Sequence, residues 1–387
     1  MTMRRGRRCR SLAVAVAVGL ALPAGAPGAA QSVSAAPNHV DKVMSSVSAD
    51  SATDAWAVGD VHGRPSGWHW DGASWVETPI SASPRVGVVD VLSLAPHNAF
   101  GVGSWLDRDG LHHALITHWN GEAWARMSRP HIGSGCDFTS WLSAVGGTSG
   151  RDVWAVGHSG DCNSKSLILH WNGTRWRHLT SPYGHYCIYG ACTLRAVSAD
   201  RVDDAWAVGG ALVAHWNGRS WQRAPLPEPR RDTNLFFLTG VTALSPRNVW
   251  AVGRVYVQRR PNVLHDLILH WNGTQWSRVH SPEPGPMWNE LADVDAVSAR
   301  DVWAVGTYHD ATKTPKHRSL IIHWNGTAWS RVASPQPGRA SDVISVSALS
   351  GSNAWVVGSY VADETTGLLR CLVLHWNGQR WTRMPSP

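Results

Sequence analysis

One compound motif recurs seven times along the 387-residue chain, and it constrains the fold more than any other feature. Each copy begins with a segment of the type Asp-x-Trp-Ala-Val-Gly led by Asp or Asn, continues with His-Trp-Asn-Gly, and closes with a Trp two residues later. The leading residues are Asp54, Asn98, Asp152, Asp204, Asn248, Asp301 and Asn353. The His residues are His69, His118, His170, His215, His270, His323 and His375. The closing Trp residues are Trp75, Trp124, Trp176, Trp221, Trp276, Trp329 and Trp381.

The spacing of these copies predicts the architecture. Successive leading residues are 44, 54, 52, 44, 53 and 52 residues apart. A period of this length is expected when each repeat is a small four-stranded sheet, and such sheets stack radially into a β-propeller. We therefore predict an all-β fold, a seven-bladed β-propeller of four-stranded antiparallel blades.

Each repeat can be divided into four strands, as the fifth copy shows. An apolar and β-branched run at 238–243 precedes the leading Asn, and Trp-Ala-Val-Gly forms a second strand. The run 267–271 forms a third strand, and the Asn-Gly that follows supplies the positive φ angles of a tight hairpin before a fourth strand at 276–279. No segment outside the N-terminus shows a sustained helical period of apolar residues.

The loop lengths differ between the two faces that such a ring must have. The spacing from the motif His to the closing Trp is 6 in all seven repeats, whereas the spacing from the Gly of Ala-Val-Gly to the next His is 10, 15, 13, 6, 17, 17 and 17. Strand direction alternates, so the second-to-third loops and the loops between repeats share one face, here called the variable face. The other face, with its uniform turns, is here called the uniform face. Diverse loops on a repeated scaffold usually carry binding or catalysis.

The N-terminus predicts export. Five Arg residues precede an apolar stretch at 11–22 and a small-residue region at 23–30, the order of a secretory signal peptide. We expect a signal peptide at 1–30, a short segment at 31–42, and the propeller at 43–387, giving a monomeric, secreted, extracellular protein that is not embedded in a membrane. Beyond residue 30 the chain has 30 basic against 28 acidic residues, which argues against nucleic acid as a partner.

The motif resembles a known group of proteins. Sevenfold Asp-x-Trp-Ala-Val-Gly with His-Trp-Asn-Gly-x-x-Trp is similar to the secreted propeller repeat proteins abundant in actinobacteria, which are distantly like kelch and WD-repeat propellers. The resemblance covers residues 43–387. It implies the propeller fold and leaves the function open, because propellers serve as lectins, lyases, hydrolases and scaffolds.

Residues at repeated positions are expected to be structural. Of 24 Trp residues, 20 stand at repeat positions, and Phe100 replaces one. The seven repeated His residues are spread around the ring, so they cannot converge on one metal ion. Four Trp residues break the pattern. Trp68 aligns with third-strand core positions, whereas Trp105, Trp141 and Trp288 fall in or beside loops of the variable face.

The candidate ligand-binding residues are aromatic and ionisable groups on the variable face. Exposed aromatic rings beside polar groups suit sugar rings, whose apolar faces stack on them. His and carboxylate side chains that follow the second strands, near the expected channel mouth, could bind a ligand or act as acid and base. The candidates are Trp105, Trp141, Trp288, His158, Asp161, Tyr308, His309 and Tyr186. No nucleophile elbow, phosphate-binding loop, metalloprotease or dinucleotide motif is present, so we expect no cofactor and assign no catalytic residue.

Five cysteines lie beyond the predicted signal peptide. Cys136, Cys162, Cys187 and Cys192 cluster in sequence around the third and fourth repeats, and export makes disulfides plausible. We expect Cys136 to pair with Cys162 and Cys187 with Cys192, with Cys162 to Cys187 as the competing bridge. A zinc site is the alternative, although the CxxC spacing is absent. Cys371 falls in a third strand and is expected to be a buried thiol.

Two further expectations concern function and ring closure. The leading hypothesis is a secreted propeller that binds a glycan or cell-envelope polymer on the variable face. The alternatives are an extracellular lyase or hydrolase using His and Asp residues at the channel mouth, and a protein-interaction scaffold. For closure, we favour a clasp in which the C-terminal strand at 381–384 completes the first blade and protects the sheet edges.

Overall fold

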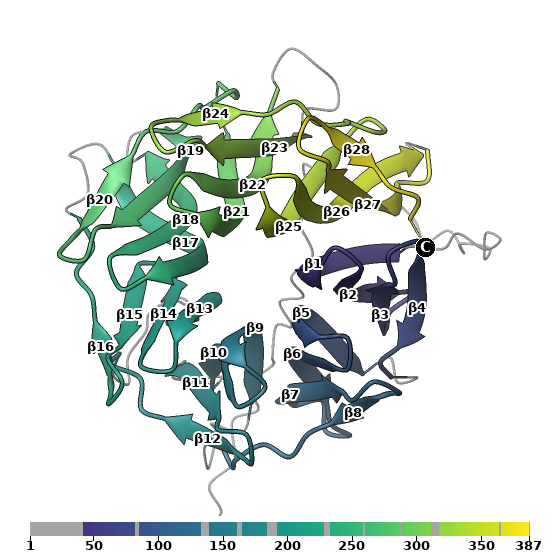
Figure 1. Ribbon diagram of the computed structural model, residues 1–387, viewed down its shortest axis with the longest axis vertical. Coiled ribbons are helices and arrows are strands. Elements are labelled where there is room, and N and C mark those ends of the chain that lie inside the picture. Colours follow the sequence, from purple (N-terminus) through teal and green to yellow (C-terminus); the bar gives the residue numbers. More distant parts are fainter. Residues whose placement is uncertain are drawn as a thin grey trace, which may run out of the picture. The chain divides into compact units, whose positions relative to one another are not determined.

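Seven four-stranded antiparallel sheets make up the part of the chain that the computed structural model describes, and they stand around a central axis as the blades of a propeller (Figure 1). The described residues are 42–81, 85–132, 139–160, 165–183, 192–227, 233–257, 260–286, 288–310, 317–363 and 365–386. They contain no helix that could cross a membrane. The predicted fold class is confirmed.

The strands of each blade follow one another in chain order from the axis to the rim. Blade 1 contains β1 (Lys42–Ser51), β2 (Asp54–Val61), β3 (Arg64–Trp70) and β4 (Trp75–Pro79). Blade 2 contains β5 (Val86–Ala95), β6 (Asn98–Leu106), β7 (His112–Trp119) and β8 (Trp124–Arg126). Blade 3 contains β9 (Ser140–Ser149), β10 (Asp152–Ser159), β11 (Lys165–Trp171) and β12 (Trp176–Leu179). Blade 4 contains β13 (Ala196–Arg201), β14 (Asp204–Gly209), β15 (Leu212–Trp216) and β16 (Trp221–Arg223).

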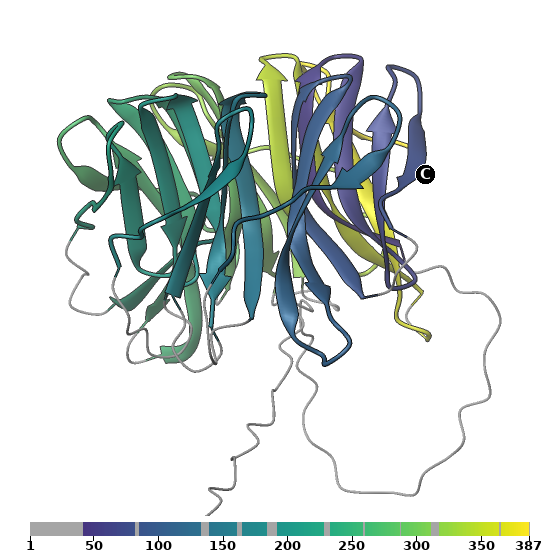
Figure 2. The same ribbon diagram turned by 90° about the horizontal axis from the view of Figure 1, so that it is seen from below.

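The remaining three blades have the same order. Blade 5 contains β17 (Thr233–Ser245), β18 (Asn248–Val257), β19 (Arg260–Trp271) and β20 (Trp276–Val279). Blade 6 contains β21 (Asn289–Ser298), β22 (Asp301–His309), β23 (His317–Trp324) and β24 (Trp329–Arg331). Blade 7 contains β25 (Ser341–Ser350), β26 (Asn353–Asp363), β27 (Leu368–Trp376) and β28 (Trp381–Arg383). In side view the strands run between the variable and the uniform face (Figure 2).

The polar residues of the motif hold each blade together at the uniform face. The motif His donates or accepts a hydrogen bond through Nε2 with the leading Asp or Asn of its own blade in all seven repeats, at 2.9 Å for His118 with Asn98 and 2.7 Å for His170 with Asp152. The Trp that follows the His donates from Nε1 to a backbone carbonyl just before the leading residue, again in every blade. The structural role predicted for the repeated His residues is confirmed.

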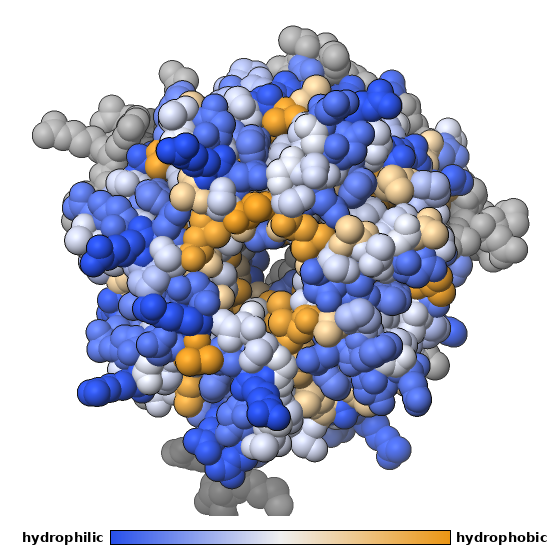
Figure 3. Space-filling model, viewed as in Figure 1, coloured by the Kyte–Doolittle hydropathy of each residue, from blue (hydrophilic) through white to orange (hydrophobic). Residues whose placement is uncertain are grey.

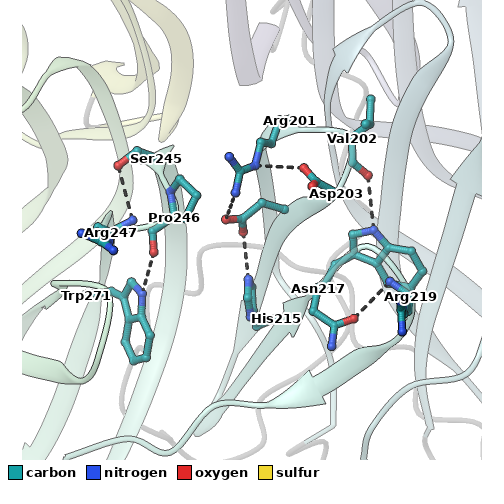
Figure 4. A network of polar contacts seen from close by, with 12 residues as sticks. Arg201, Val202, Asp203, His215, Asn217, Arg219, Ser245, Pro246, Arg247 and Trp271 are labelled. Atoms are coloured by element: carbon teal, nitrogen blue, oxygen red, sulfur yellow. Dashed lines mark hydrogen bonds and ion pairs between the residues drawn. The ribbon is translucent and has the colours of Figure 1, made fainter.

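Figure 4 shows this arrangement in blades 4 and 5. His215 bonds Asp204 at 2.9 Å, and Trp271 Nε1 donates to the Pro246 carbonyl at 3.1 Å. Blade 4 adds an exposed ion pair, Arg201 with Asp203 at 2.9 Å. Where the partner of the His is Asn, no negative charge offsets burial, and burial lowers the pKa of His118, His270 and His375. These three side chains are therefore neutral at physiological pH.

The Gly of Ala-Val-Gly makes room for a bulge in the innermost strand. In blade 3 the pairing of β9 with β10 shifts between Val156 and Gly157, which leaves one extra residue in β9. This brings the β9 backbone against Gly157, so that a Cβ there would overlap the Trp141 carbonyl oxygen and lie 2.8 Å from the Leu142 Cα. The equivalent glycine meets the same obstruction in every blade: Gly59, Gly103, Gly209, Gly253, Gly306 and Gly358.

Tryptophans of neighbouring blades interlock. The Trp of each Asp-x-Trp segment packs its edge or face against two Trp residues of the next blade, as Trp154 does against Trp216 at 5.2 Å and Trp221 at 5.1 Å between ring centroids. The same contacts recur at the other interfaces, except that Phe100 replaces Trp in blade 2. Trp68 and the free thiol Cys371 are also buried, as predicted.

The expected clasp between the chain ends is wrong. Strand β28 pairs with β27 inside blade 7, and β1 to β4 form blade 1 without a strand from the C-terminus. The ring closes by side-chain packing instead. Trp355 of blade 7 lies 5.0 Å from Trp70 and 5.3 Å from Trp75 of blade 1, the same contacts that join the other neighbouring blades except blades 2 and 3. The Asn377-Gly378 turn holds β28 beside β27.

The innermost strands bond to one another through side chains, since they have no further strand on the axial side. Serine and aspartate oxygens of one blade accept backbone N–H groups of the next, such as Ser345 from Val47 at 3.2 Å and Asp90 from Val145 at 2.8 Å. Equivalent bonds join Ser347 to Ala49, Ser48 to Ser93, Ser198 to Ala243, Asp293 to Val346 and Asp295 to Ala348. They line a central channel of about 420 Å³, whose opening is visible in Figure 3.

Three carboxyl groups of this channel make stability depend on pH. Burial raises the pKa of Asp90 to about 7, of Asp293 to about 6 and of Asp295 to about 7. Because these pKa values lie above the unfolded value of 3.8, the folded state binds more protons than the unfolded state between about pH 4 and 7. The free energy of unfolding should therefore fall as the pH rises through this window.

Replacing Asp90 with Asn should therefore stabilise the protein at pH 8 by about 1–2 kcal/mol and flatten this dependence. The amide can still accept from Val145 and donate to Ser46, whose hydroxyl now donates to Asp90 at 2.5 Å. Asp295→Asn is the matched contrast. Both carboxylate oxygens of Asp295 accept backbone N–H groups at 2.8 Å, so the amide nitrogen of the variant would face another donor and should not give the same stabilisation. Urea unfolding at pH 5 and pH 8 measures both variants, and equal pH slopes for wild type and Asp90→Asn would contradict the prediction.

The predicted disulfides fall mostly outside the described residues. Cys136, Cys162 and Cys187 lie there, whereas Cys192 is described and buried. The pairing stays a prediction. Asp161 and Tyr186, two candidate ligand-binding residues, and the segment 1–41 also lie outside the description.

Candidate functional site

The remaining predicted site residues form two groups on the variable face. One group lies in blades 2 and 3 and contains Trp105, Trp141 and His158. The other lies in blade 6, where Trp288 directly precedes β21, and Tyr308 and His309 end β22. The first strand of each blade is the one that lines the channel, so residues following a second strand lie one strand further out than expected (Figure 1). The two groups differ in how open their aromatic rings are.

Trp141 is enclosed by two imidazole rings. His158, directly opposite it on β10, stacks at 4.6 Å with an interplanar angle of 16°, and His112 of blade 2 lies 4.7 Å away at 33°. Nearly parallel rings at these distances occupy the indole surface that a sugar would need. Trp141 therefore packs blade 3 against blade 2 through His112, and His158 covers its ring from within blade 3.

Trp105 is covered in a similar way. The Arg126 guanidinium lies 4.2 Å from the ring centroid and the His113 ring lies 4.7 Å away. His113 is in turn fixed by Asp107, 2.8 Å from its Nε2. The Trp105 indole nitrogen is buried. These contacts give Trp105 a packing role and leave little of its ring for a ligand.

Tyr308 belongs to the core of blade 6. Its side chain is buried, and its hydroxyl accepts a hydrogen bond from Arg331 at 2.7 Å. Tyr360 and Arg383 make the same pair in blade 7, at 2.6 Å and with the same separation of 23 residues. A contact that repeats between blades at a fixed spacing is structural, so we leave Tyr308 out of the candidate site.

Trp288 differs from the other two tryptophans because its side chain is open to solvent. It is 37% exposed, and it is one of four large apolar residues exposed in the described part of the chain. Its Nε1 donates to Glu290 at 3.3 Å, its carbonyl accepts the backbone N–H of His309 at 2.8 Å, and His317 packs edge-on at 5.8 Å. The structure thus brings two predicted residues, Trp288 and His309, together beside His317.

A charged cluster adjoins Trp288 across the interface of blades 5 and 6. Glu290 forms an ion pair with Arg254, whose guanidinium lies 4.5 Å from the centroid of Phe237. The Arg195 guanidinium of blade 4 lies over the same ring at 4.7 Å. Burial, followed by the charge of Arg254, lowers the pKa of Arg195. The contacts run continuously from Trp288 through Glu290, Arg254 and Phe237 to Arg195.

Sequence reasoning missed these four residues, although a signal existed. Arg254 directly follows the Gly of Ala-Val-Gly, a position held elsewhere by Asp60, Ser104, His158, Gly210, Thr307 and Ser359. Phe237 and Glu290 are the inner-strand residues whose carbonyl oxygens lie against the motif glycines Gly253 and Gly306, where a Cβ would overlap them. Since both positions lie beside the bulge at the axial end of the variable face, comparing them between repeats would have found the cluster.

A buried acid lies beside Arg254. Asp266 is 2% exposed and pairs in register with Arg254 across β18 and β19. Ser281 donates to its Oδ2 at 2.6 Å, and burial raises its pKa to about 7, partly opposed by the Ser281 hydrogen bond. No group of three or more His, Cys, Asp or Glu side chains within the described ranges is arranged to hold a metal ion.

Comparison with known proteins identifies the class, seven-bladed β-propellers, without a family. No protein-family model and no curated protein matches the sequence. Among solved structures, the chain is similar to a polysaccharide lyase, an ulvan lyase bound to -[GlcA(1-4)Rha3S]-, with a TM-score of 0.59 and 9% identity over 90% of this chain and 97% of that one.

A second similarity is to YCF48. The form from Cyanidioschyzon merolae has a TM-score of 0.53 and 14% identity over 89% of this chain and 97% of that one. YCF48 bound to D1 peptide has a TM-score of 0.52 and 12% identity, covering 88% and 93%. Identities this low show a shared fold and nothing finer.

Proposed function

We propose that this protein is a secreted propeller that binds a glycan, such as a cell-envelope polysaccharide, on its variable face at Trp288. The observation that carries the proposal is the open indole of Trp288, held in place by Glu290 and rimmed by imidazole, carboxylate and guanidinium groups. An apolar ring face next to fixed polar groups suits a pyranose, which is apolar on its ring face and polar at its edge.

The fold is compatible with this function. Propellers of similar architecture include the ulvan lyase, which was solved with a bound saccharide, and YCF48, which was solved with a bound peptide. The protein-interaction alternative therefore stays a competing outcome. Export is part of the proposal and is supported by the order of basic, apolar and small residues in the first 30 positions.

Trp288→Ala should weaken binding to the preferred polysaccharide by roughly thirtyfold, about 2 kcal/mol, as expected when a central aromatic contact is lost. Binding can be measured by a glycan array followed by sedimentation with insoluble cell-wall polysaccharide. Trp105→Ala is the matched control, because it removes another off-pattern tryptophan from the same face whose ring is already covered.

Two results would contradict the proposal. One is wild-type protein that retains no glycan on the array or in sedimentation. The other is a Trp105→Ala variant that loses binding while Trp288→Ala keeps it. Release of new sugar chain ends from a bound polysaccharide would favour the enzyme alternative, and this assay can be run on the same samples.

A further inference from the structure

We infer that Arg195, together with Arg254 and Phe237, forms a subsite for a carboxylate or sulfate group, so that the ligand is an acidic polysaccharide. This inference rests on the proposed function, because it names the class of glycan that would extend from Trp288. It depends on the position of Arg195, on the balance of charge around Phe237 and on the shape of blade 4.

Arg195 has an unusual position in the ring. It is the extra residue of the inner-strand bulge in blade 4. Its backbone nitrogen lies beside the motif glycine Gly209, where an added Cβ would come too close to it. The other six blades carry uncharged residues at this position: Ser45, Val89, Ser143, Thr239, Ala292 and Ile344. Arg195 is therefore the one charged residue among the seven bulge residues. It lies at the channel, toward the variable face.

The charges around Phe237 do not balance. Two guanidinium groups lie over one ring, and the carboxylate of Glu290 is paired with Arg254. As a residue Arg195 is exposed, but its guanidinium is partly desolvated where it lies over Phe237 beside Arg254, and the charge of Glu290 attracts it. Within the described ranges its side chain has no hydrogen-bond acceptor. Two like charges held together repel each other. A bound anion would relieve this repulsion and complete the hydrogen bonds of Arg195.

Blade 4 carries a short hairpin beside the exposed Arg195. The β14–β15 hairpin extends least on the variable face, since the spacing from Gly209 to His215 is only 6, whereas the same spacing is 10 to 17 in the other blades. Gly210 in this turn bonds the neighbouring blade through the N–H of Leu238 at 2.8 Å. Within the described residues, this turn therefore extends less far than the β18–β19 hairpin of blade 5, whose strands reach Val257 and begin at Arg260.

The chemistry selects planar or tetrahedral oxyanions. A guanidinium presents paired N–H donors that match the oxygens of a carboxylate or sulfate, and charge-assisted hydrogen bonds of this kind are the stronger ones. The purely structural explanation is that both arginines simply cover Phe237. That explanation predicts an effect of Arg195 on thermal stability and none on the charge preference of binding.

The test compares Arg195→Gln with Arg219→Gln in the full mature protein. Arg219 lies in the exposed Asn217-Gly218 turn of the same blade, on the uniform face, so both variants lose one charge from blade 4. The probes are polygalacturonate, dextran sulfate and neutral dextran, with glucuronate, inorganic sulfate and glucose as small ligands. Calorimetry at low and high salt gives the affinities, and thermal melting shows whether each variant is folded.

The expected result is that wild type prefers acidic over neutral probes at low salt, and that Arg195→Gln lowers this preference tenfold or more. Arg219→Gln should behave as wild type, and Arg195→Lys should restore part of the preference because it keeps the charge without the paired donors. A higher affinity for polygalacturonate assigns the carboxylate, and a higher affinity for dextran sulfate assigns the sulfate.

The inference is overturned if wild type binds acidic and neutral probes equally, or if folded Arg195→Gln keeps the full preference. Its failure can be separated from failure of the proposed function. Trp288-dependent binding of neutral dextran without a preference for acids would leave the function standing and remove the subsite. Arg195-dependent binding of glucuronate or sulfate without any polymer binding would support the subsite and remove the proposed function.

Discussion

Trp355→Ala should destabilise the propeller by about 3–5 kcal/mol, the range for removal of a fully buried aromatic side chain. Trp355 is 1% exposed and joins the last blade to the first through Trp70 and Trp75, with centroids 5.0 and 5.3 Å away. Among the described strands none crosses this interface, so side-chain packing, together with the hydrogen bonds of Ser345 and Ser347, closes the ring here. Loss of the indole leaves a cavity at the junction of the chain ends.

Urea unfolding followed by circular dichroism measures the loss, with Trp288→Ala as the control for replacing an exposed tryptophan. The control should change the free energy of unfolding by less than about 0.5 kcal/mol. Similar values for the two variants would contradict closure through Trp355. Trp154→Ala, at the interface of blades 3 and 4, should be about as destabilising as Trp355→Ala because its contacts are equivalent.

Gly157→Ala should destabilise the protein by about 3 kcal/mol, although it adds a single methyl group. The new Cβ would overlap the Trp141 carbonyl oxygen and approach the Leu142 Cα to 2.8 Å. Both atoms belong to the backbone of the bulged inner strand, so no side chain can rotate away to relieve the overlap. The sheet itself would have to shift, and the inner strand would move from the channel wall.

Gly87→Ala provides the contrast, because Gly87 lies in an inner strand where a new Cβ would meet no atom within 4 Å beyond its chain neighbours. That substitution should leave stability within about 0.5 kcal/mol of wild type. Thermal and urea unfolding of the two variants, side by side, measure the difference. Equal stabilities would show that the bulge can relax, and the explanation of the repeated glycine would then fail.

The site could be predicted in part. Trp288 and His309 were identified because they break the repeat, and the structure brings them together. The same reasoning selected Trp105 and Trp141, whose rings are covered by Arg126, His113, His112 and His158. A break in the pattern indicates that a residue is not needed for the common blade, but whether its ring is open depends on side chains from neighbouring strands and blades.

The sequence by itself determined the number of blades, the four strands of each and the faces on which their loops lie, because the motif repeats the local requirements of every strand and turn. The glycine of each Asn-Gly turn has a positive φ angle, and the His and leading Asp or Asn pair within one blade, so both signals are local. Tertiary structure decided how the ring closes, which strand lines the channel and which charges meet around Phe237. These features join residues from different blades, and no local signal in the chain specifies such distances.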